Sequence, residues 1–321
     1  GYNALTALTT AVNTIAIGYG AAAAITTTDT KGTYIGYSAG AAVTSGAENI
    51  LIGYQTGDAI TTGGENVAIG NQALGGNDTG SKNVAIGDRT LVSLNPSGSV
   101  DMYNTAVGYK AGYAATTGIK NTLVGGLAGD AITTGIGNVA IGYDALSAED
   151  GNGYNTAIGY EALKVQNAGA DAYNVAIGSQ AGTAVATAIK NILIGGLAGS
   201  DITTGNYNVA IGHEALETED QGAANTAIGY QTLKNLNNDS GSNTAIGYQA
   251  GTNMTSGYNN VLVGAQAGRI TTVGINNVFL GTNAGYTNVD GSRSVAVGHK
   301  ALYVQEPSGA TDCYNIGIGE T

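Results

Sequence analysis

The chain has 321 residues, among them 53 glycines, 19 tyrosines, two prolines and one cysteine, and its formal net charge is −12. The single cysteine, Cys313, excludes an internal disulfide framework, and the acidic charge argues against nucleic acid or an anionic membrane surface as a partner, because both need basic patches. No apolar run reaches the ~18 residues of a membrane span, so we expect no membrane insertion.

A pentapeptide, Asn-x-Ala-Ile-Gly, recurs along the whole chain, and its last glycine marks an anchor that usually returns after ~17 residues. A short fixed period of this kind is typical of a solenoid, in which each repeat forms one coil. The sequence therefore predicts one all-β domain over residues 1–321, a parallel β-solenoid of about 18 coils of ~17 residues. The anchors are Gly1, Gly18, Gly36, Gly53, Gly70, Gly87, Gly108, Gly125, Gly142, Gly159, Gly178, Gly195, Gly212, Gly229, Gly247, Gly264, Gly281, Gly298 and Gly319.

The residues before each anchor predict a strand that is apolar on both faces. Val, Ile, Leu or Thr stands one and three residues before the anchor, as in Val67 and Ile69, and these side chains share one face because a strand alternates. The residue between them is usually alanine, as in Ala68, and it points to the opposite face. A lone solenoid has only one interior, so we expect the alanine face to pack closely against other copies of the chain in a homotrimeric fibre.

After each anchor we expect a turn and a second short strand. A glycine ten residues past the anchor, such as Gly63, is expected to supply positive φ at a turn. The asparagine four residues before the anchor, such as Asn66 or Asn83, is expected to hydrogen-bond from coil to coil. No stretch combines helical periodicity with capping residues, so the sequence predicts no helix.

A longer period overlies the short one, because every fourth interval between anchors is longer than the three before it. It predicts a block of four coils that was duplicated, with the additional residues bulging on one side once per block. Such bulges are candidates for specific binding, since loops on a rigid scaffold tolerate change, although they can also be neutral insertions or relieve twist. The blocks lie near residues 36–107, 108–177, 178–246 and 247–318, and the bulges at 94–102, 165–172, 235–242 and 305–312.

Two stretches carry a resemblance to known families. Residues 294–301 read Ser-Val-Ala-Val-Gly-His-Lys-Ala and resemble the Val-Ala-Ile-Gly repeats of trimeric autotransporter adhesin heads. Residues 243–250 read Asn-Thr-Ala-Ile-Gly-Tyr-Gln-Ala and resemble repeats of phage tail-fibre proteins. The resemblance implies a left-handed parallel β-roll, a homotrimer, and an extracellular place on a virion tail fibre or a bacterial surface. The coil of this chain is longer than that of the adhesin heads.

Tyrosine often follows the anchor directly, which predicts a row of aromatic rings on consecutive coils. Such a row is either a glycan-binding surface or a packing ladder at a subunit boundary, since tyrosine has an apolar body and a polar end. The candidate binding residues are Tyr109, Tyr143, Tyr160, Tyr230 and Tyr248.

Oxygen-bearing side chains eight residues past the anchor are weak candidates for calcium. Calcium takes about six to eight oxygen ligands, and only two or three would meet here, so Asx turns are the alternative reading. The candidate pairs are Asp78 with Asn95, Asp150 with Asn167, and Asp220 with Asn237. We expect no other metal site and no cofactor.

We expect no enzyme, because two histidines, one cysteine and scattered carboxylates do not supply a convergent base, nucleophile and oxyanion donor. Three functions stay open. The first is a fibre segment that attaches to a host cell or surface through a glycan or a receptor. The second is a structural shaft or self-stacking filament, because exposed strand edges favour end-to-end association. The third is an ice-binding solenoid. Without an initiator methionine, the chain is expected to be a piece of a longer protein.

Overall fold

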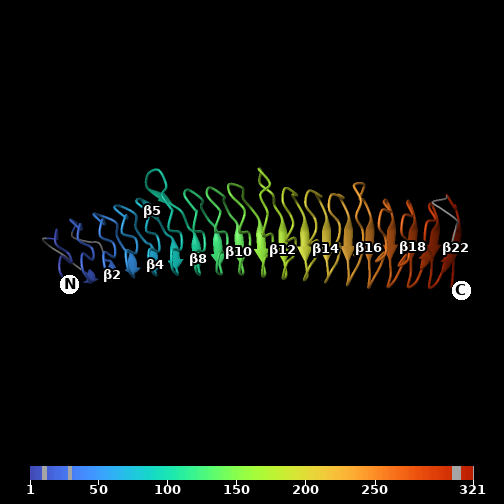
Figure 1. Cartoon of the computed structure of the whole chain (residues 1–321), viewed down its shortest axis with the longest axis horizontal. Helices are drawn as coiled ribbons and strands as arrows, with labels where there is room; N and C mark the ends of the chain where they lie inside the picture. Colours follow the sequence, from blue (N-terminus) through green and yellow to red (C-terminus); the bar gives the residue numbers. More distant parts are fainter. Residues whose placement is uncertain (9–12, 28–30, 306–311, 321) are drawn as a thin grey trace. The chain divides into compact units, whose positions relative to one another are not determined.

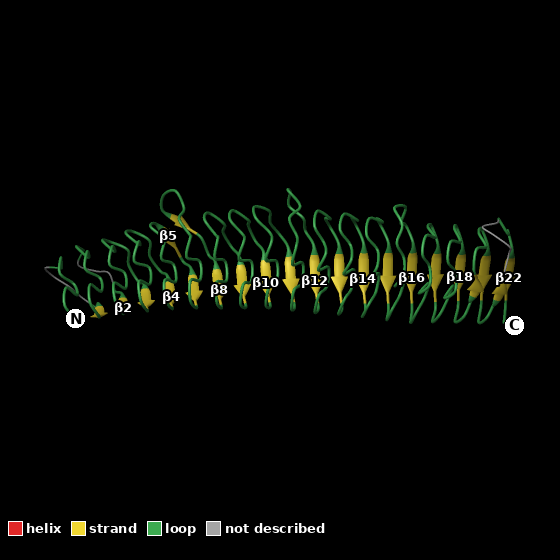
Figure 2. Cartoon of the chain, in the orientation of Figure 1, coloured by secondary structure: helices red, strands yellow, loops and turns green. Residues whose placement is uncertain are grey.

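The computed structural model describes residues 1–8, 13–27, 31–305 and 312–320, which form strands and turns without any helix (Figure 2). The fold is an all-β parallel solenoid of about 17–18 coils, which confirms the predicted fold class. It divides into two compact units, residues 1–155 with 169–171, and residues 156–168 with 172–321. The single domain, the handedness and the trimer stay predictions.

The first unit contains one three-residue strand per coil, and each strand pairs in parallel with that of the next coil (Figure 1). Its strands are β1 (Ile15–Ile17), β2 (Thr33–Ile35), β3 (Ile50–Ile52), β4 (Val67–Ile69), β5 (Gly80–Ser81), β6 (Val84–Ile86), β7 (Val100–Asp101), β8 (Thr105–Val107), β9 (Thr122–Val124) and β10 (Val139–Ile141).

The second unit repeats this arrangement with the same parallel pairing. Its strands are β11 (Thr156–Ile158), β12 (Val175–Ile177), β13 (Ile192–Ile194), β14 (Val209–Ile211), β15 (Thr226–Ile228), β16 (Thr244–Ile246), β17 (Val261–Val263), β18 (Val278–Leu280), β19 (Thr287–Asn288), β20 (Val295–Val297), β21 (Val304–Gln305) and β22 (Ile316–Ile318).

The additional residues of a bulge leave the strand register intact. In a regular step Val67 pairs with Ile50 of the preceding coil, and across the longer interval of the first bulge Thr105 still pairs with Val84 in the same way. The chain therefore extrudes the insertion outside the strand, and Figure 1 shows it as a loop beside β5. Most of the fourth bulge, residues 306–311, lies outside the described residues.

The alanine of each strand forms the interior of the coil, which corrects the predicted orientation. Ala68 and Ala140 are fully buried, whereas Ile69 and Ile141 are each 37% exposed. The physical reason is that the interior of the coil is narrow. Residues that follow the anchor, such as the fully buried Ala73 and Leu74, already fill part of it. The larger β-branched side chains therefore face outward.

In several coils a large residue on one side of this interior stands opposite a small residue on the other side. Where the strand supplies Leu123, the residue four past the anchor is Gly129, and a Cβ added there would lie 2.8 Å from Leu123 Cδ2. Where the strand supplies Ala140, the corresponding residue is Leu146, fully buried. Gly129 and Leu146 both have positive φ, at 56° and 54°, so glycine is needed here for space rather than for conformation.

Two further expectations about the coil are wrong. A second strand occurs only as the short pairs β5–β7 and β19–β21, and the other described coils have turns in that place. Among the described glycines ten past the anchor only Gly169 has positive φ, at 70°, and the others, such as Gly63, lie outside the left-handed region. A Cβ on Gly63 would lie 2.5 Å from the carbonyl oxygen of Gly80, so the glycine permits close stacking of neighbouring coils.

The predicted asparagine ladder is confirmed. Asn49 Nδ2 donates to the carbonyl of Gly63 at 2.9 Å, and Asn49 Oδ1 accepts the backbone N–H of Asn66 at 3.0 Å. The second unit repeats the pattern at Asn191 and Asn208. Because these side chains are fully buried, each amide joins two neighbouring coils through hydrogen bonds for which water does not compete.

Candidate functional site

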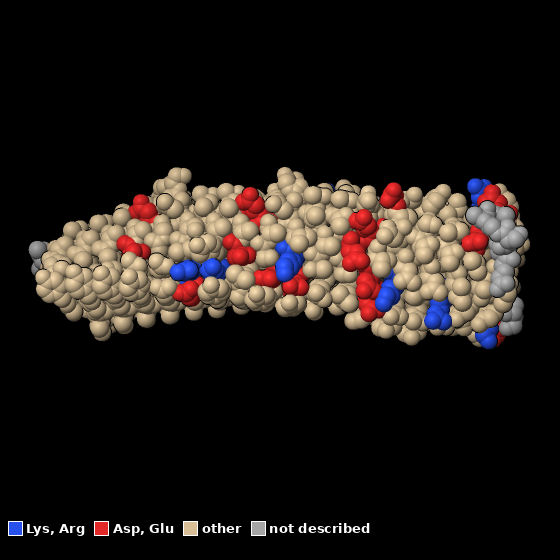
Figure 3. Space-filling view, viewed as in Figure 1, with Lys and Arg blue, Asp and Glu red and all other residues tan. Residues whose placement is uncertain are grey.

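The outward face of the sheet is apolar in both units. The first residue of each strand is Val, Ile or Thr and the last is Ile, Val or Leu, so this face carries no charge among the eighteen strands of the main stack. Ile50, Ile141, Ile192 and Ile246 are between 37% and 41% exposed. On the side drawn in Figure 3, charged groups are also sparse and gather in a few clusters. The sheet face shares the depletion of charged residues that the core of a protein interface shows.

The tyrosines that follow the anchors stack in rows. In the first unit the ring centroids of Tyr2, Tyr19, Tyr37 and Tyr54 lie 5.6, 5.2 and 5.2 Å apart in order, with interplanar angles of 10–17°. In the second unit His213, Tyr230 and Tyr248 stack at 5.9 and 5.5 Å. Within a row each ring covers a face of its neighbour, so a row presents ring edges rather than ring faces to solvent.

The five predicted tyrosines therefore differ in what they can do. Tyr230 and Tyr248 lie in a stacked row, which favours the packing alternative for them. Tyr109 and Tyr143 lie in coils that are separated by the coil of Gly126, and Tyr160 is 50% exposed in the second unit. The row from Tyr2 to Tyr54 is absent from our predicted binding residues, although its signal was tyrosine after four consecutive anchors.

The calcium candidates are not brought together as a metal site. The carboxylates of Asp78, Asp150 and Asp220 each accept a hydrogen bond from a threonine hydroxyl of the preceding coil, Thr61, Thr133 and Thr203 respectively. Asn95, Asn167 and Asn237 are exposed. Within the described residues no group of three or more His, Cys, Asp or Glu side chains is arranged to hold a metal ion. Calcium binding stays a prediction.

A set of buried polar side chains seven residues past the anchor escaped the sequence analysis. It occurs in the third coil of each block, where the other coils mostly have an aliphatic residue. Gly80 N–H donates to Asn77 Oδ1 at 3.0 Å, Asn152 N–H to Glu149 Oε1 at 3.1 Å, and Gly222 N–H to Glu219 Oε1 at 2.7 Å. The set is Asn77, Glu149, Glu219 and Asn288, all fully buried.

The reason lies in the bulge of the following coil. In a regular coil the corresponding N–H donates to the next coil, as Gly118 does to the carbonyl of Thr133 at 3.2 Å. The bulge displaces that acceptor, and a buried N–H without a partner would be unfavourable, so the side chain accepts it instead. Burial raises the pKa of Glu149 and of Glu219, and their hydrogen bonds partly offset this. The role of these carboxyls is structural.

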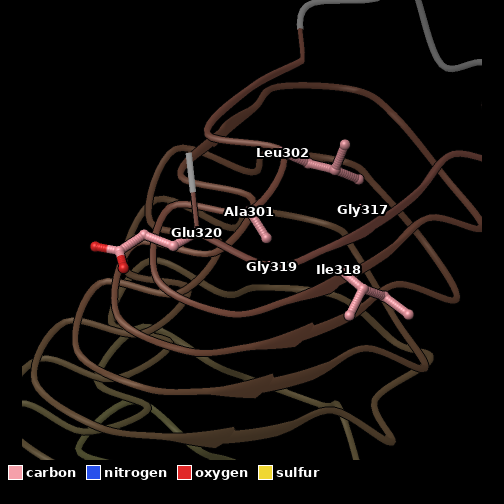
Figure 4. Close-up of a pocket in the computed structure, with 6 residues that line it drawn as sticks. All are labelled: Ala301, Leu302, Gly317, Ile318, Gly319 and Glu320. Carbon is pink, nitrogen blue, oxygen red and sulfur yellow. The ribbon is translucent and has the colours of Figure 1, made fainter.

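A small cavity of about 130 Å³ lies against β22, at the last described coils (Figure 4). Leu302 and Ile318 supply most of its apolar side-chain surface, and Glu320 is its one ionisable residue. A single carboxylate without a nucleophile or an oxyanion donor beside it does not make a catalytic set, so this cavity offers hydrophobic contact. Its lining residues are Ala301, Leu302, Gly317, Ile318, Gly319 and Glu320.

Comparison with known proteins finds no matching family model, no matching curated protein and no matching solved structure. In the part of the chain that the structure describes, no helix has the length and apolar character that a membrane span requires.

Proposed function

We propose that the chain is a non-enzymatic segment of an extracellular fibre that attaches to a host cell or surface, as part of a phage tail fibre or a bacterial adhesin. The observation that carries this proposal is the uncharged face of Val, Ile, Leu and Thr side chains that every coil of the main stack turns outward. Isolated soluble proteins rarely expose a contiguous apolar patch beyond a few hundred Å² (about 300–600 Å²). A repeated face of this kind favours packing against further copies, and the proposed assembly is a homotrimer.

Attachment is assigned to the bulges, because they are the part of the coil that varies. Gly98 and Gly169 both lie at bulge tips where a Cβ would meet nothing within 4 Å, so these tips are accessible to a partner. A hydrogen bond ties the tip of the first bulge to the preceding coil, where Thr79 Oγ1 donates to the carbonyl of Gly98 at 2.7 Å. Copies of a bulge on a repeated scaffold would raise weak contacts to useful avidity.

Deleting residues 96–99 tests this proposal, because it returns the first bulge to the length of a regular coil. We expect the variant to keep its circular dichroism and its oligomeric state and to lose attachment to host cells or to immobilised glycans by roughly tenfold. The matched control deletes residues 97–98 alone, and it shows whether the loss of attachment grows with the number of bulge residues removed. Attachment that is unchanged in both deletions would favour the alternative of a purely structural shaft.

Ice binding has less support in the described residues. The first threonine of several Thr-Thr pairs uses its hydroxyl within the chain, as Thr116 Oγ1 donates to the carbonyl of Thr133 at 3.1 Å and Thr133 Oγ1 to that of Asp150 at 3.2 Å. A measurement of thermal hysteresis separates this function from the other two.

A further inference from the structure

One position in the tyrosine column of the first unit lacks a side chain between two tyrosines. Tyr109, Gly126 and Tyr143 each follow the anchor in three consecutive coils, whose strands β8, β9 and β10 pair in order. Where consecutive coils all carry tyrosine here, the rings stack at 5.2–5.6 Å. Two coil steps place the rings of Tyr109 and Tyr143 about 10 Å apart, with no ring between them.

The backbone does not require glycine at this position. Gly126 lies outside the left-handed φ region, and a Cβ there would lie 3.4 Å from Tyr143 Cδ2, an ordinary contact. Other coils carry Tyr, Asn, Asp or His at the same place, such as Tyr37 and Asp88. Gly126 therefore leaves room for one ring between the two tyrosines, which a tyrosine at this position would have occupied.

The two flanking rings are accessible, and the backbone that carries them is held by hydrogen bonds between coils. Tyr109 is 52% exposed and Tyr143 is 50% exposed. The N–H of Leu127 donates to the carbonyl of Tyr109 at 2.9 Å, and the N–H of Asp144 donates to the carbonyl of Gly126 at 3.1 Å. These bonds fix the spacing of the three coils, so a ligand would meet a largely preformed site.

We propose that Tyr109 and Tyr143 bind one neutral pyranose ring of a glycan between them. A ring with C–H groups on both faces would make dispersion contacts with an aromatic face on each side. Lys110, whose Nζ lies 5.3 Å from the centre of the Tyr109 ring, follows Tyr109 in the chain, and Asp144 follows Tyr143. An ammonium donor and a carboxylate acceptor suit sugar hydroxyls, and their opposite charges favour an uncharged sugar. This site deepens the glycan attachment proposed above and rests on it.

The test uses saturation-transfer difference NMR on the full chain with methyl β-D-glucopyranoside, methyl β-D-galactopyranoside and methyl N-acetyl-β-D-glucosaminide as probes. We expect transfer to the ring protons of at least one glycoside, with affinity reduced at least tenfold in Gly126→Tyr. The substituted tyrosine would stack between Tyr109 and Tyr143, as Tyr37 stacks between Tyr19 and Tyr54, so the fold is expected to persist. Tyr109→Leu provides a second loss-of-binding variant if Gly126→Tyr fails to fold.

The matched control is Gly196→Tyr in the second unit, where Ser179 and His213 occupy the neighbouring positions and only one is aromatic. It should leave glycoside binding unchanged. Three results would overturn the site: no probe binds, binding is equal in wild type and Gly126→Tyr, or indole binds in place of every glycoside. Because the probes are free monosaccharides, failure here is separable from failure of attachment through the bulges, which the deletion of 96–99 measures.

Discussion

Glu219 occupies an inward position that most coils fill with an aliphatic side chain, and its two carboxyl oxygens differ sharply. Oε1 accepts the N–H of Gly222 at 2.7 Å, whereas Oε2 is buried without a hydrogen-bond partner. Burial is the main cause that raises the pKa of this carboxyl. The N–H of Gly222 needs a side-chain acceptor because the following coil bulges. The negative charge of the carboxylate is not needed for that hydrogen bond.

The raised pKa predicts that this carboxyl stabilises the fold less as pH increases. A folded-state pKa above the unfolded value means that the folded protein holds the proton more tightly. Stability is then greatest below the unfolded pKa and declines as pH rises through the folded pKa. We expect Glu219→Gln to be more stable than the natural chain at pH 8, by on the order of 1 kcal/mol, and to match it more closely at pH 4.

Urea unfolding at the two pH values measures this difference. Glu48→Gln is the control, because the side chain of Glu48 is 56% exposed. An equal pH dependence for Glu219→Gln and the natural chain would show that the buried charge has no effect on stability.

At the scale of the element, each coil is defined by how two sides share a narrow interior. Leu51 with Gly57 and Leu123 with Gly129 place the bulk on the strand, whereas Ala68 with Leu74 places it after the anchor. In these coils one large residue is present, although its source alternates. In the coil of Ala106 and Gly112 both residues are small, and a Cβ on Gly112 would lie 2.7 Å from Leu91 Cδ2 of a neighbouring coil. Interiors packed at crystal-like density require such compensation, because neither a void nor an overlap is tolerated well.

Exchanging the two residues within one coil should therefore be tolerated better than either single change. Leu123→Ala leaves a cavity and is expected to destabilise by about 2–4 kcal/mol. Gly129→Leu places a side chain where a Cβ is already 2.8 Å from Leu123 and is expected to destabilise by about 1–3 kcal/mol. The double variant reproduces the arrangement of Ala140 with Leu146 and should recover at least half of the summed loss.

A double-mutant cycle from urea unfolding gives the coupling between the two positions. Additive losses would contradict a shared interior volume. Leu123→Ala combined with Gly46→Ala serves as a reference pair, because Gly46 lies in a different coil, where its contacts are with Gly63 and Asn49.

At the scale of the whole molecule, the same outward face recurs in both units and is the surface of the proposed assembly. The aliphatic residues at the strand ends form this face, and alanine is hidden behind it. Charges therefore act differently at neighbouring positions of one strand. A charge at Ile141 enters solvent or an interface, whereas a charge at Ala140 enters the interior of the coil.

We expect Ile141→Lys to keep the fold and to weaken the proposed trimer, because a lysine in an apolar interface must be desolvated. Ala140→Glu and Ala157→Glu should instead unfold the coil locally, since each places an unpaired charge in a filled interior. Multi-angle light scattering and circular dichroism separate the two outcomes. A natural chain that is a stable monomer near 31.8 kDa would contradict the trimer.

The sequence by itself determined the coil, because its period and strand pattern are local properties. The regular spacing of the anchors predicts a parallel solenoid, and the asparagine before each strand predicts the buried ladder that joins Asn49 to Asn66. The tertiary structure alone decided which strand face lies inside. Alternation defines two faces without giving their direction, and hydrophobicity alone would place Ile69 inside rather than Ala68. The buried residues that follow the anchor leave space only for a small side chain, so alanine lies inside and isoleucine outside. The same three-dimensional stacking brings the rings of Tyr230 and Tyr248 to 5.5 Å from each other, whereas Gly126 places no ring between Tyr109 and Tyr143.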